Sequence, residues 1–433
     1  MRVLMLGWEF PPHISGGLGT ACEGLTRGLA SEAVDLTFVV PRAFGDEDTH
    51  HLEFIGLTAP PGEARPAPAG RGDAVRVLAV DSMLRPYLDE AAYRALLEAR
   101  EIAAREVGIV EEDAPLSQAD GRPAFEGGYG ENLMDEVARY ADAVAELARH
   151  TAFDLVHAHD WMTFPAGVAA SKIAETPLVV HVHASEYDRS GDHANPVVVD
   201  IERMGIAAAD RIVAVSRLTA GVLQERYGAD ADRIRVVHNA VTQEARGERE
   251  AEAKAFEDPI VLFLGRVTFQ KGPEYFIEAS RRVVDIRPDV RVVMSGSGDM
   301  LPGMIEHAAR IGIGRNVHFT GFLQGEDVER MYELADLYVM PSVSEPFGIT
   351  PLEAMRLDTP VIVSRQSGVS EVLENVLKVD FWDIEDLANK ILAVLERPAL
   401  RQELRREGLD EVRALRWEHS AARLRQVYEE VLA

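Results

Sequence analysis

Short apolar runs rich in β-branched residues alternate with longer amphipathic runs along most of this chain. Apolar runs bounded by polar turns are typical of buried strands, whereas the longer runs have the period of helices. The pattern predicts strands at residues 2–6, 36–40, 75–80, 155–158, 178–182, 212–215 and 234–237, and again at 260–264, 290–294, 317–320, 337–340 and 360–363. This alternation predicts parallel sheets covered by helices on both faces.

A charged, alanine-rich stretch at residues 243–258 interrupts the pattern, and the strands restart at Ile260. We therefore predict an α/β fold with two doubly wound, Rossmann-like parallel-sheet domains, residues 1–245 and 257–415, joined by a linker at 246–256. Ligands of such sheets bind at the carboxyl ends of the strands, so two facing domains would hold a ligand in the cleft between them. The last segment, residues 416–433, is amphipathic and predicts a closing helix at 417–432.

Two regions depart from this scheme. Residues 46–73 are rich in proline, glycine and charge, and predict a long surface loop. Residues 83–130 contain a helical run at 90–107 and then a polar, glycine-containing loop, before helix returns at 131–150. Such an insertion is either a substrate-specific element or a surface elaboration, and the sequence leaves both open.

Composition narrows the class of protein. The chain has 433 residues, a formal net charge of −27 and a single cysteine, Cys22, which excludes an internal disulfide and a cysteine zinc cluster. It has no dominant Lys/Arg block and no apolar run near the roughly 18 residues of a membrane helix. We therefore expect a cytoplasmic enzyme with neither a nucleic-acid nor a membrane partner. The basic residues are nearly all arginine, which reflects either a GC-rich genome or a surface adapted to high salt.

The stretch at residues 338–355 combines the strongest candidate features for chemistry. An apolar strand breaks into a loop that ends at Gly348, and the chain then enters a helix with Thr350 as its predicted N-cap. The backbone N–H groups and the positive dipole end of a helix N-terminus suit a phosphate. Two carboxylates, Glu345 in the loop and Glu353 in the helix, stand eight positions apart.

Histidines and glycines follow the predicted strands of the first domain. Gly16-Gly17 precedes a helix and lets a ligand approach the backbone closely, although its spacing is not that of the dinucleotide fingerprint. The segment 157–161, His-Ala-His-Asp-Trp, follows one strand, and the segment 181–183, His-Val-His, ends the next. We interpret His157 and His159 as lying on alternate faces of their strand, where they could not easily reach one ion. We therefore predict no metal.

A basic turn follows the first strand of the second domain. Arg266 and Lys271, five positions apart, can neutralise a diphosphate, one by a planar fork and the other as a point charge. The spacing is not that of a Walker loop. Asp230-Ala231-Asp232 has the form of a metal motif, but it lies in a polar turn before a strand, and we interpret it as a turn cap.

Together these segments resemble the retaining glycosyltransferases of the GT-B fold, of the glycogen-synthase and sucrose-phosphate-synthase kind (families 4 and 5). The resemblance covers nearly the whole chain. Residues 345–353 match the E-x7-E signature of the family, and Gly265-Arg266 with Lys271-Gly272 matches its diphosphate-binding pair. Gly16-Gly17-Leu18 matches its N-terminal glycine loop, and residues 157–161 with His183 match its first-domain cleft residues.

The resemblance implies a function. A hexose, most simply glucose, would pass with retention from a nucleoside-diphosphate sugar to a carbohydrate acceptor such as an α-glucan, without a metal or another cofactor. The C-terminal helix would cross back to the first domain, and Asn239 would lie near the hinge.

It also implies residue roles. Arg266 and Lys271 would hold the donor diphosphate, Glu353 the ribose and Glu345 the sugar. The implied catalytic residues are Arg266, Lys271, His183, Glu345 and Asp160, with His183 near the anomeric centre and Asp160 on the acceptor side. The implied donor-binding residues are Gly16, Gly17, Leu18, Phe322, Leu323, Phe347, Gly348, Ile349, Thr350 and Glu353, with Phe322 and Leu323 bordering the nucleobase.

One departure from the family pattern bears on the donor. Glycogen and starch synthases that use ADP-glucose carry a lysine two residues before the Gly-Gly pair, where this chain has Ile14. The nucleotide (UDP, ADP or GDP), the acceptor and the oligomeric state, including a homo-oligomer, therefore stay open. The alternatives are a small-acceptor enzyme of the sucrose-phosphate-synthase kind, a GT-B sugar-nucleotide epimerase and a non-catalytic glycan-binding protein.

Overall fold

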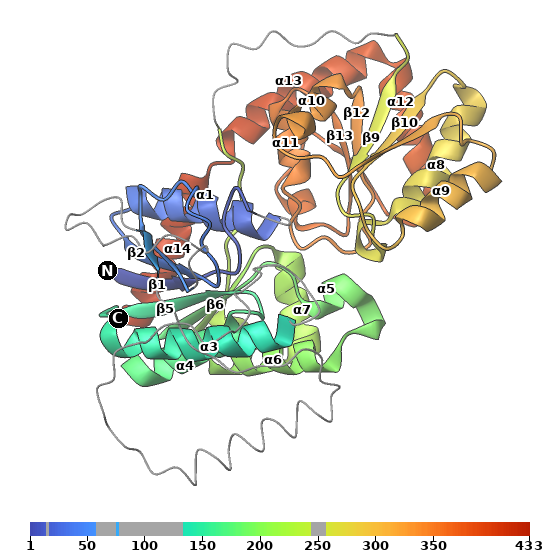
Figure 1. Cartoon of the computed structure of the whole chain (residues 1–433). Helices are drawn as coiled ribbons and strands as arrows, with labels where there is room; N and C mark the ends of the chain where they lie inside the picture. Colours follow the sequence, from blue (N-terminus) through green and yellow to red (C-terminus); the bar gives the residue numbers. More distant parts are fainter. Residues whose placement is uncertain (14–16, 58–74, 78–132, 244–256) are drawn as a thin grey trace. The chain divides into compact units, whose positions relative to one another are not determined.

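The computed structural model describes residues 1–13, 17–57, 75–77, 133–243 and 257–433 and contains two parallel β-sheets (Figure 1). The first sheet has eight strands in the order β4-β3-β2-β1-β5-β6-β7-β8, and the second has six in the order β11-β10-β9-β12-β13-β14. In both sheets the chain starts in the interior, winds to one edge and then returns to build toward the other. The prediction of an α/β fold with two doubly wound sheets is confirmed.

The strands of the first sheet are β1 (Arg2–Leu6), β2 (Asp35–Val40), β3 (Glu53–Gly56), β4 (Val75–Val77), β5 (Leu155–His159), β6 (Leu178–Val182), β7 (Arg211–Ala214) and β8 (Ile234–Val236). Those of the second are β9 (Ile260–Leu264), β10 (Arg291–Ser295), β11 (Val317–Gly321), β12 (Leu337–Met340), β13 (Val361–Ser364) and β14 (Leu377–Val379). The helices are α1 (Gly17–Ser31), α3 (Leu133–His150), α4 (Phe164–Ala174), α5 (Glu186–Ser190), α6 (Pro196–Ala208), α7 (Arg217–Tyr227), α8 (Pro273–Ile286), α9 (Leu301–Arg310), α10 (Glu326–Leu334), α11 (Thr350–Arg356), α12 (Ile384–Glu396), α13 (Pro398–Ala414) and α14 (Trp417–Leu432).

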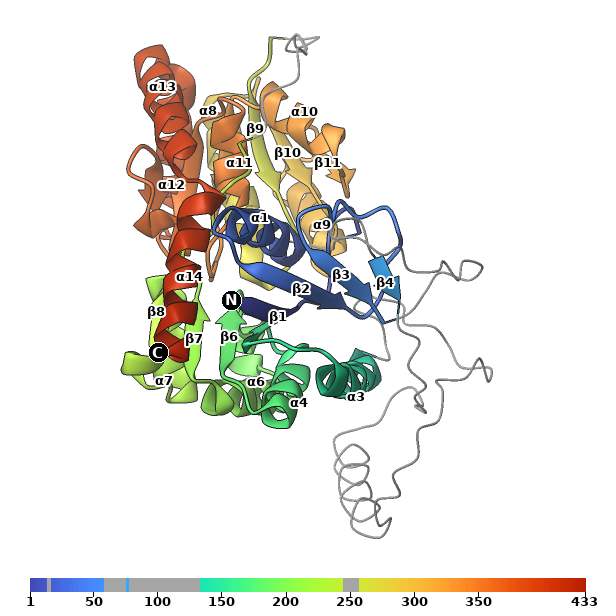
Figure 2. The same cartoon turned by 90° about the vertical axis from the view of Figure 1, so that its left-hand side faces the viewer.

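Helices cover both faces of the first sheet. α3, α4 and α6 lie on one face, and α1 with the C-terminal half of α14 lies on the other (Figures 1 and 2). Every residue of the central strands β5 and β6 is buried. Because both faces are covered, these strands are apolar at successive positions rather than at alternating ones, apart from His157, His159 and His181.

The second sheet divides its side chains between two cores. On β9, Val261 and Phe263 pack in one buried cluster with residues of α8, α9 and α12. Ile260 and Leu262 point the other way, into a cluster with residues of α10, α11 and α13. This is the two-residue period of a strand with helices on both faces.

The predicted closing helix is present as α14, and it packs on the first sheet. The Tyr428 hydroxyl lies 2.7 Å from His157 Nδ1 on β5. Arg425 Nη1 lies 3.3 Å from a carboxylate oxygen of Glu32, beyond the end of α1. These contacts confirm that the C-terminal helix returns to the first domain.

Part of the predicted surface loop at residues 46–73 is wrong, because β3 lies within it and pairs in parallel with β2. Phe54 is fully buried, with its ring centroid 5.2 Å from that of Phe10. Strand β14 was not predicted either. Each strand is only three or four residues long and contains a charged residue, Glu53 in β3 and Lys378 in β14, so neither forms a recognisable apolar run. The predicted helical run at 90–107 lies outside the described residues, whereas α3 agrees with the helix predicted at 131–150.

By contact density the chain forms two compact units. One is Met1–His181 with Asn195–Ile212 and Arg425–Ala433, and the other is Val182–Ala194 with Val213–Leu424. The last strand of the first sheet, β8, and the first strand of the second, β9, lie on either side of the predicted linker. The compact units do not divide there, because the second unit includes Val182–Ala194 and extends from Val213 to Leu424. The domain limits at residues 245 and 257 therefore stay a prediction.

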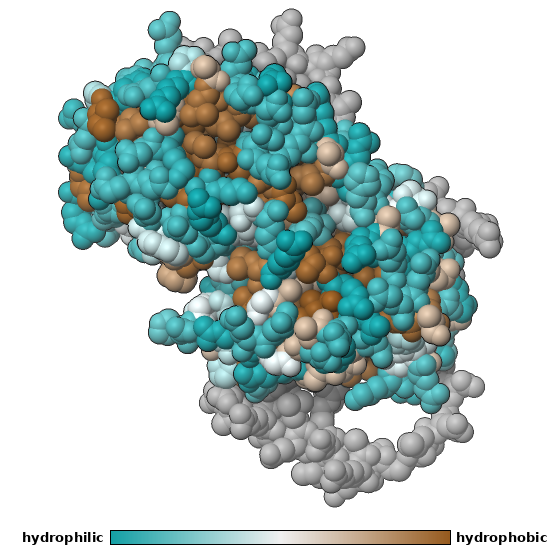
Figure 3. Space-filling view, turned by 180° about the vertical axis from the view of Figure 1, so that it is seen from behind, coloured by the Kyte–Doolittle hydropathy of each residue, from teal (hydrophilic) through white to brown (hydrophobic). Residues whose placement is uncertain are grey.

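The surface is mainly hydrophilic in the view from behind, with apolar residues gathered in separate patches (Figure 3). Among the helices of the described residues, none is long and apolar enough to cross a membrane.

Candidate active site

The basic turn at residues 265–272 follows the carboxyl end of β9. Two glycines make its path feasible, since Gly265 has φ +151° and Gly272 has φ +64°. A Cβ at Gly272 would lie 2.2 Å from the Pro341 carbonyl oxygen, so only glycine lets this turn approach the loop after β12. The two loops are also joined by a hydrogen bond of 2.9 Å from the Val343 N–H to the Gln270 carbonyl.

Lys271 and Glu345 meet across these two loops, although 74 positions separate them in the chain. Lys271 Nζ lies 2.5 Å from Glu345 Oε2, and the Ser342 hydroxyl donates to the same oxygen at 3.1 Å. The Glu345 residue is only 6% exposed. The carboxylate is therefore fixed by two donors at the carboxyl edge of the second sheet.

Arg266 is exposed on the same basic turn. Its Nη2 atom donates to Gln270 Oε1 at 3.3 Å, and Gln270 itself is buried. Arg266 and Lys271 therefore place two positive charges on one turn, as the diphosphate hypothesis requires.

Helix α11 begins differently from the prediction, because Ile349, not Thr350, is at the N-cap position. The Thr350 hydroxyl is engaged elsewhere, 2.9 Å from the Tyr338 hydroxyl. Tyr338 also lies 3.2 Å from the Leu264 carbonyl oxygen, at the end of β9. A buried phenol thus joins the start of the basic turn to the start of α11.

Glu353 lies in α11, and the residue as a whole is half-buried. The Tyr332 hydroxyl donates to Glu353 Oε2 at 3.2 Å. Burial raises the pKa of Glu353, although the Tyr332 hydrogen bond and the charge of Arg356 act in the opposite direction.

The other predicted donor-binding residues of the second sheet differ in exposure. Phe322 is 59% exposed, and Leu323 beside it is half-buried, as is Ile349. Phe347 is only 2% exposed, and its ring packs in the core against α11. Gly348 has φ +98°, a conformation that favours glycine. Phe347 could therefore meet a ligand through its backbone rather than through its ring.

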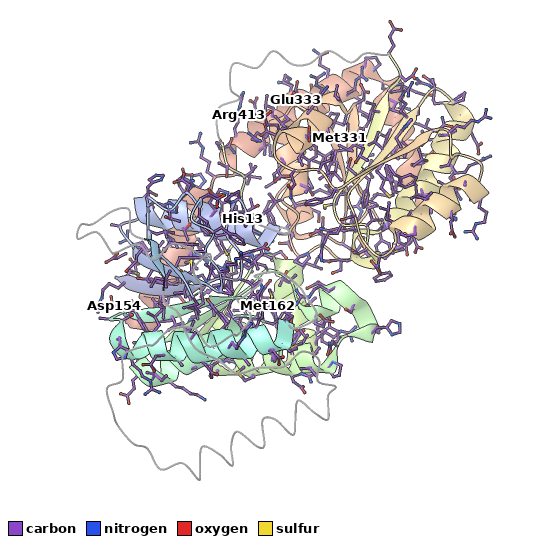
Figure 4. All side chains as sticks on the ribbon, viewed as in Figure 1. His13, Asp154, Met162, Met331, Glu333 and Arg413 are labelled. Atoms are coloured by element: carbon purple, nitrogen blue, oxygen red, sulfur yellow. The ribbon has the colours of Figure 1, made fainter. Side chains whose placement is uncertain are left out.

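Asp160 follows β5 in an unusual backbone conformation. Its φ is +58°, and the residue is 5% exposed. Its N–H donates to the His181 carbonyl at 2.9 Å, and the Thr163 hydroxyl donates to the Asp160 carbonyl at 3.1 Å. Met162, labelled in Figure 4, lies in the same turn. A left-handed residue other than glycine, held by its surroundings at a strand end, is a common feature of functional sites.

His183 follows β6 and is half-buried. Burial lowers the pKa of its imidazole to about 3, so the ring is neutral at physiological pH.

Of the predicted N-terminal glycine loop, Gly17 is exposed at the start of α1 and Leu18 is half-buried, whereas Gly16 lies outside the described residues. Asn239 is 7% exposed. Asp230 accepts a hydrogen bond from the Asp232 N–H at 3.0 Å, which confirms it as a turn cap.

The interpretation that His157 and His159 occupy alternate faces of their strand is wrong. Residues two apart in a strand share a face, and the two ring centroids are 4.2 Å apart. His181 on β6 lies beside both rings.

Two family models together match most of the chain. The model for glycosyl transferases group 1 matches residues 245–410, and the model for Glycosyltransferase Family 4 matches residues 91–245. The D-inositol 3-phosphate glycosyltransferase of Nocardia farcinica is 33% identical over 336 residues, which span 71% of this chain and 74% of that protein. The chain belongs to the GT-B glycosyltransferases of the family 4 and 5 type. This confirms the resemblance seen in the sequence.

Two further relatives align with this glycosyltransferase over nearly its full length. The glycogen synthase of Mycobacterium tuberculosis strain H37Rv is 23% identical over 436 residues, covering 99% of this chain and 94% of that protein. The sucrose-phosphate synthase from Thermosynechococcus elongatus has the same fold, with a TM-score of 0.69 and 19% identity, covering 99% of this chain and 98% of that structure.

Sequence reasoning did not identify several residues that shape the site of this glycosyltransferase. Tyr338 lies in the apolar strand β12, and Ser342 lies in the loop that follows it. Their hydrogen bonds, to Leu264 and Thr350 and to Glu345, depend on how the strands and loops pack. Gly296 and Gly298 follow β10. A Cβ on Gly296 would lie 1.8 Å from the Gly265 carbonyl oxygen, and a Cβ on Gly298 would lie 2.3 Å from the Val267 carbonyl oxygen. The signal that could have revealed this pair is two glycines directly after a buried strand.

A small pocket opens at the carboxyl edge of the second sheet of the glycosyltransferase. It encloses about 20 Å³ and is lined by Phe263, Leu264, Gly265, Lys271, Tyr338, Val339, Met340, Ser342 and Thr350. That volume suits a single water molecule.

Proposed function

We propose that this glycosyltransferase transfers a hexose, most simply glucose, from a nucleoside-diphosphate sugar to an α-glucan acceptor, with retention of the anomeric configuration. The observation that carries the proposal is the contact of 2.5 Å between Lys271 and Glu345 at the edge of the second sheet. It brings a cation that suits the diphosphate next to a carboxylate that suits sugar hydroxyls. The similarity to a glycogen synthase supports a glucan as the acceptor.

The chemistry follows from the charge that develops on the departing diphosphate. Lys271 and Arg266 oppose this charge, and backbone N–H groups at residues 348–350 add dipoles. Since α11 has only seven residues, the individual N–H groups at its start contribute more to stabilising the diphosphate than the macrodipole of the helix does. Loss of one such contact typically costs about 2.7–4 kcal/mol of barrier. Two side-chain cations take the place that a divalent metal has in other transferases.

The other residues have supporting roles in this proposal. Glu345 would hold the donor sugar and Glu353 the ribose. On the first sheet, neutral His183 would contact the sugar near the anomeric carbon, and Asp160 would lie on the acceptor side. Retention would arise by attack of the acceptor on the same face that the diphosphate leaves, without a protein nucleophile.

The test is a donor-by-acceptor screen. The protein is incubated with UDP-glucose, ADP-glucose or GDP-mannose, each with glycogen or maltooligosaccharides, and released nucleoside diphosphate is measured. We expect one donor to release nucleotide in an acceptor-dependent way, with an α-linked product by NMR and undiminished rates in EDTA. An epimerised free sugar, or binding without turnover, would overturn the assignment.

A small phosphorylated acceptor is the second candidate. It is favoured by the 33% identity to a D-inositol 3-phosphate glycosyltransferase and by Ile14, which departs from the pattern of ADP-glucose-dependent glycogen synthases. Adding inositol phosphate and sugar phosphates to the screen separates the candidates. Nucleotide release with these acceptors and none with glucans would favour the second.

A further inference from the structure

Three histidines gather on the face of the first sheet that carries α14. His157 and His159 lie on β5, and His181 lies on β6 directly opposite His159 in the parallel register. All three residues are completely buried. Interior positions of a parallel sheet are normally filled by aliphatic residues, because buried polar groups need compensating interactions. Three imidazoles thus take the place of aliphatic side chains on two adjacent central strands.

The rings are close enough to share a ligand. The centroid of His157 is 4.2 Å from that of His159 and 5.4 Å from that of His181, and His159 and His181 are 5.1 Å apart. Each residue offers one ring nitrogen, and these three nitrogens lie within 4.8 Å of one another. Nitrogens bound to one zinc-like ion at about 2.0–2.1 Å would be roughly 3.4 Å apart in tetrahedral geometry. The nitrogens would therefore have to approach one another by no more than about 1.4 Å to bind one ion.

A second contact orients one ring. The Tyr428 hydroxyl lies 2.7 Å from His157 Nδ1. Histidines that bind metals through one nitrogen usually form a hydrogen bond with the other, which fixes the tautomer. If Nδ1 donates to Tyr428, then Nε2 has the lone pair that a metal needs. Asp160 directly follows His159 and is also buried, so a carboxylate lies in the same part of the sheet.

We propose that His157, His159 and His181 form a binding site for one divalent transition-metal ion, of the kind that prefers imidazole ligands, such as Zn²⁺ or Co²⁺. The ion would link β5 and β6 and, through Tyr428, secure the C-terminal helix. Its role is structural and is distinct from the donor chemistry at Lys271 and Glu345. The proposal does not depend on the nature of the sugar donor or acceptor.

The experiment measures metal directly. Untagged full-length protein is stripped with a strong chelator, titrated with ZnCl₂ or CoCl₂, dialysed and assayed for metal by mass spectrometry. We expect one ion per chain, visible absorption bands of a tetrahedral Co²⁺ site, and a melting temperature that rises with metal and falls again with chelator. Less than about 0.2 ion per chain would overturn the proposal.

Variants locate the ion. His159→Gln with His181→Gln should abolish the stoichiometric binding and the Co²⁺ bands, whereas His150→Gln with His193→Gln, at two exposed positions, should retain both. Circular dichroism confirms that the variants are folded. Since the first pair could destabilise the core, Tyr428→Phe is the milder variant and should weaken Co²⁺ binding about tenfold or more. Unchanged binding in the folded double variant would place the ion elsewhere and refute the site.

Discussion

Lys271 contacts a nearly buried carboxylate, so its removal should have two separable effects. Lys271→Ala should lower turnover at least about a hundredfold, since loss of one charge-stabilising contact costs about 2.7–4 kcal/mol. It should also lower the melting temperature, because Glu345 loses its cationic partner. Turnover is measured below the melting transition, with Lys172→Ala, an exposed lysine of α4, as the control. Near-normal turnover in folded Lys271→Ala would contradict the proposed role.

Because His183 has a lowered pKa in the folded chain, it should make the free energy of unfolding depend on pH. Burial lowers its pKa to about 3 in the folded chain, below the ordinary value of 6.5, so the unfolded state binds more protons between these values. This contribution to stability is therefore present above pH 6.5 and is lost as the pH falls toward 3, with a slope approaching about 1.4 kcal/mol per pH unit. His183→Asn should flatten the fall in urea-unfolding free energy between pH 7 and pH 5. The exposed His150→Asn should not, and an unchanged slope in His183→Asn would refute the assignment.

At the scale of elements, the Tyr338 hydroxyl joins the end of β9 to the start of α11 through Leu264 and Thr350. Tyr338→Phe keeps the ring in the core but removes this connection. We expect a loss of about 0.5–1.5 kcal/mol of stability and a rise of roughly tenfold in the KM for the donor, because the loop that starts α11 is no longer held. Tyr275→Phe is the control, and equal donor KM values in the two variants would argue against a positioning role.

The same elements show what the sequence could predict. Strands β1, β6, β9 and β12 match their predicted bounds because each is an apolar run between polar turns. Strand β3 was missed because four residues next to glycine and charge look like a loop. Arg266, Lys271 and Glu345 could be chosen because their spacing matches the motifs of the family, but the Lys271–Glu345 contact depends on how two loops 74 residues apart pack. The ring contacts of His157 and His159 follow from strand geometry and were missed only through an incorrect application of it.

At the scale of the whole molecule, an excess of acidic residues opposes the compact state. The chain has 72 Asp and Glu against 45 Lys and Arg, which gives the net charge of −27. Salt reduces this repulsion, since the Debye length falls from about 10 Å at 0.1 M to about 3 Å at 1 M. If the surface is adapted to high salt, the melting temperature should rise by several degrees between 0.05 and 1 M KCl, and activity should persist in molar KCl.

The control for this prediction must separate screening from general stabilisation by excluded cosolutes. Sucrose stabilises by exclusion from the protein surface without screening charge. Most of the increase with salt should therefore occur below about 0.5 M KCl, where the Debye length changes fastest, and sucrose at the same osmolality should not reproduce it. A melting temperature that is flat over this range, with activity that peaks at low salt, would instead favour the GC-rich genome as the cause of the arginine-rich composition. The acidic surface would then affect solubility and association rather than the stability of the two sheets.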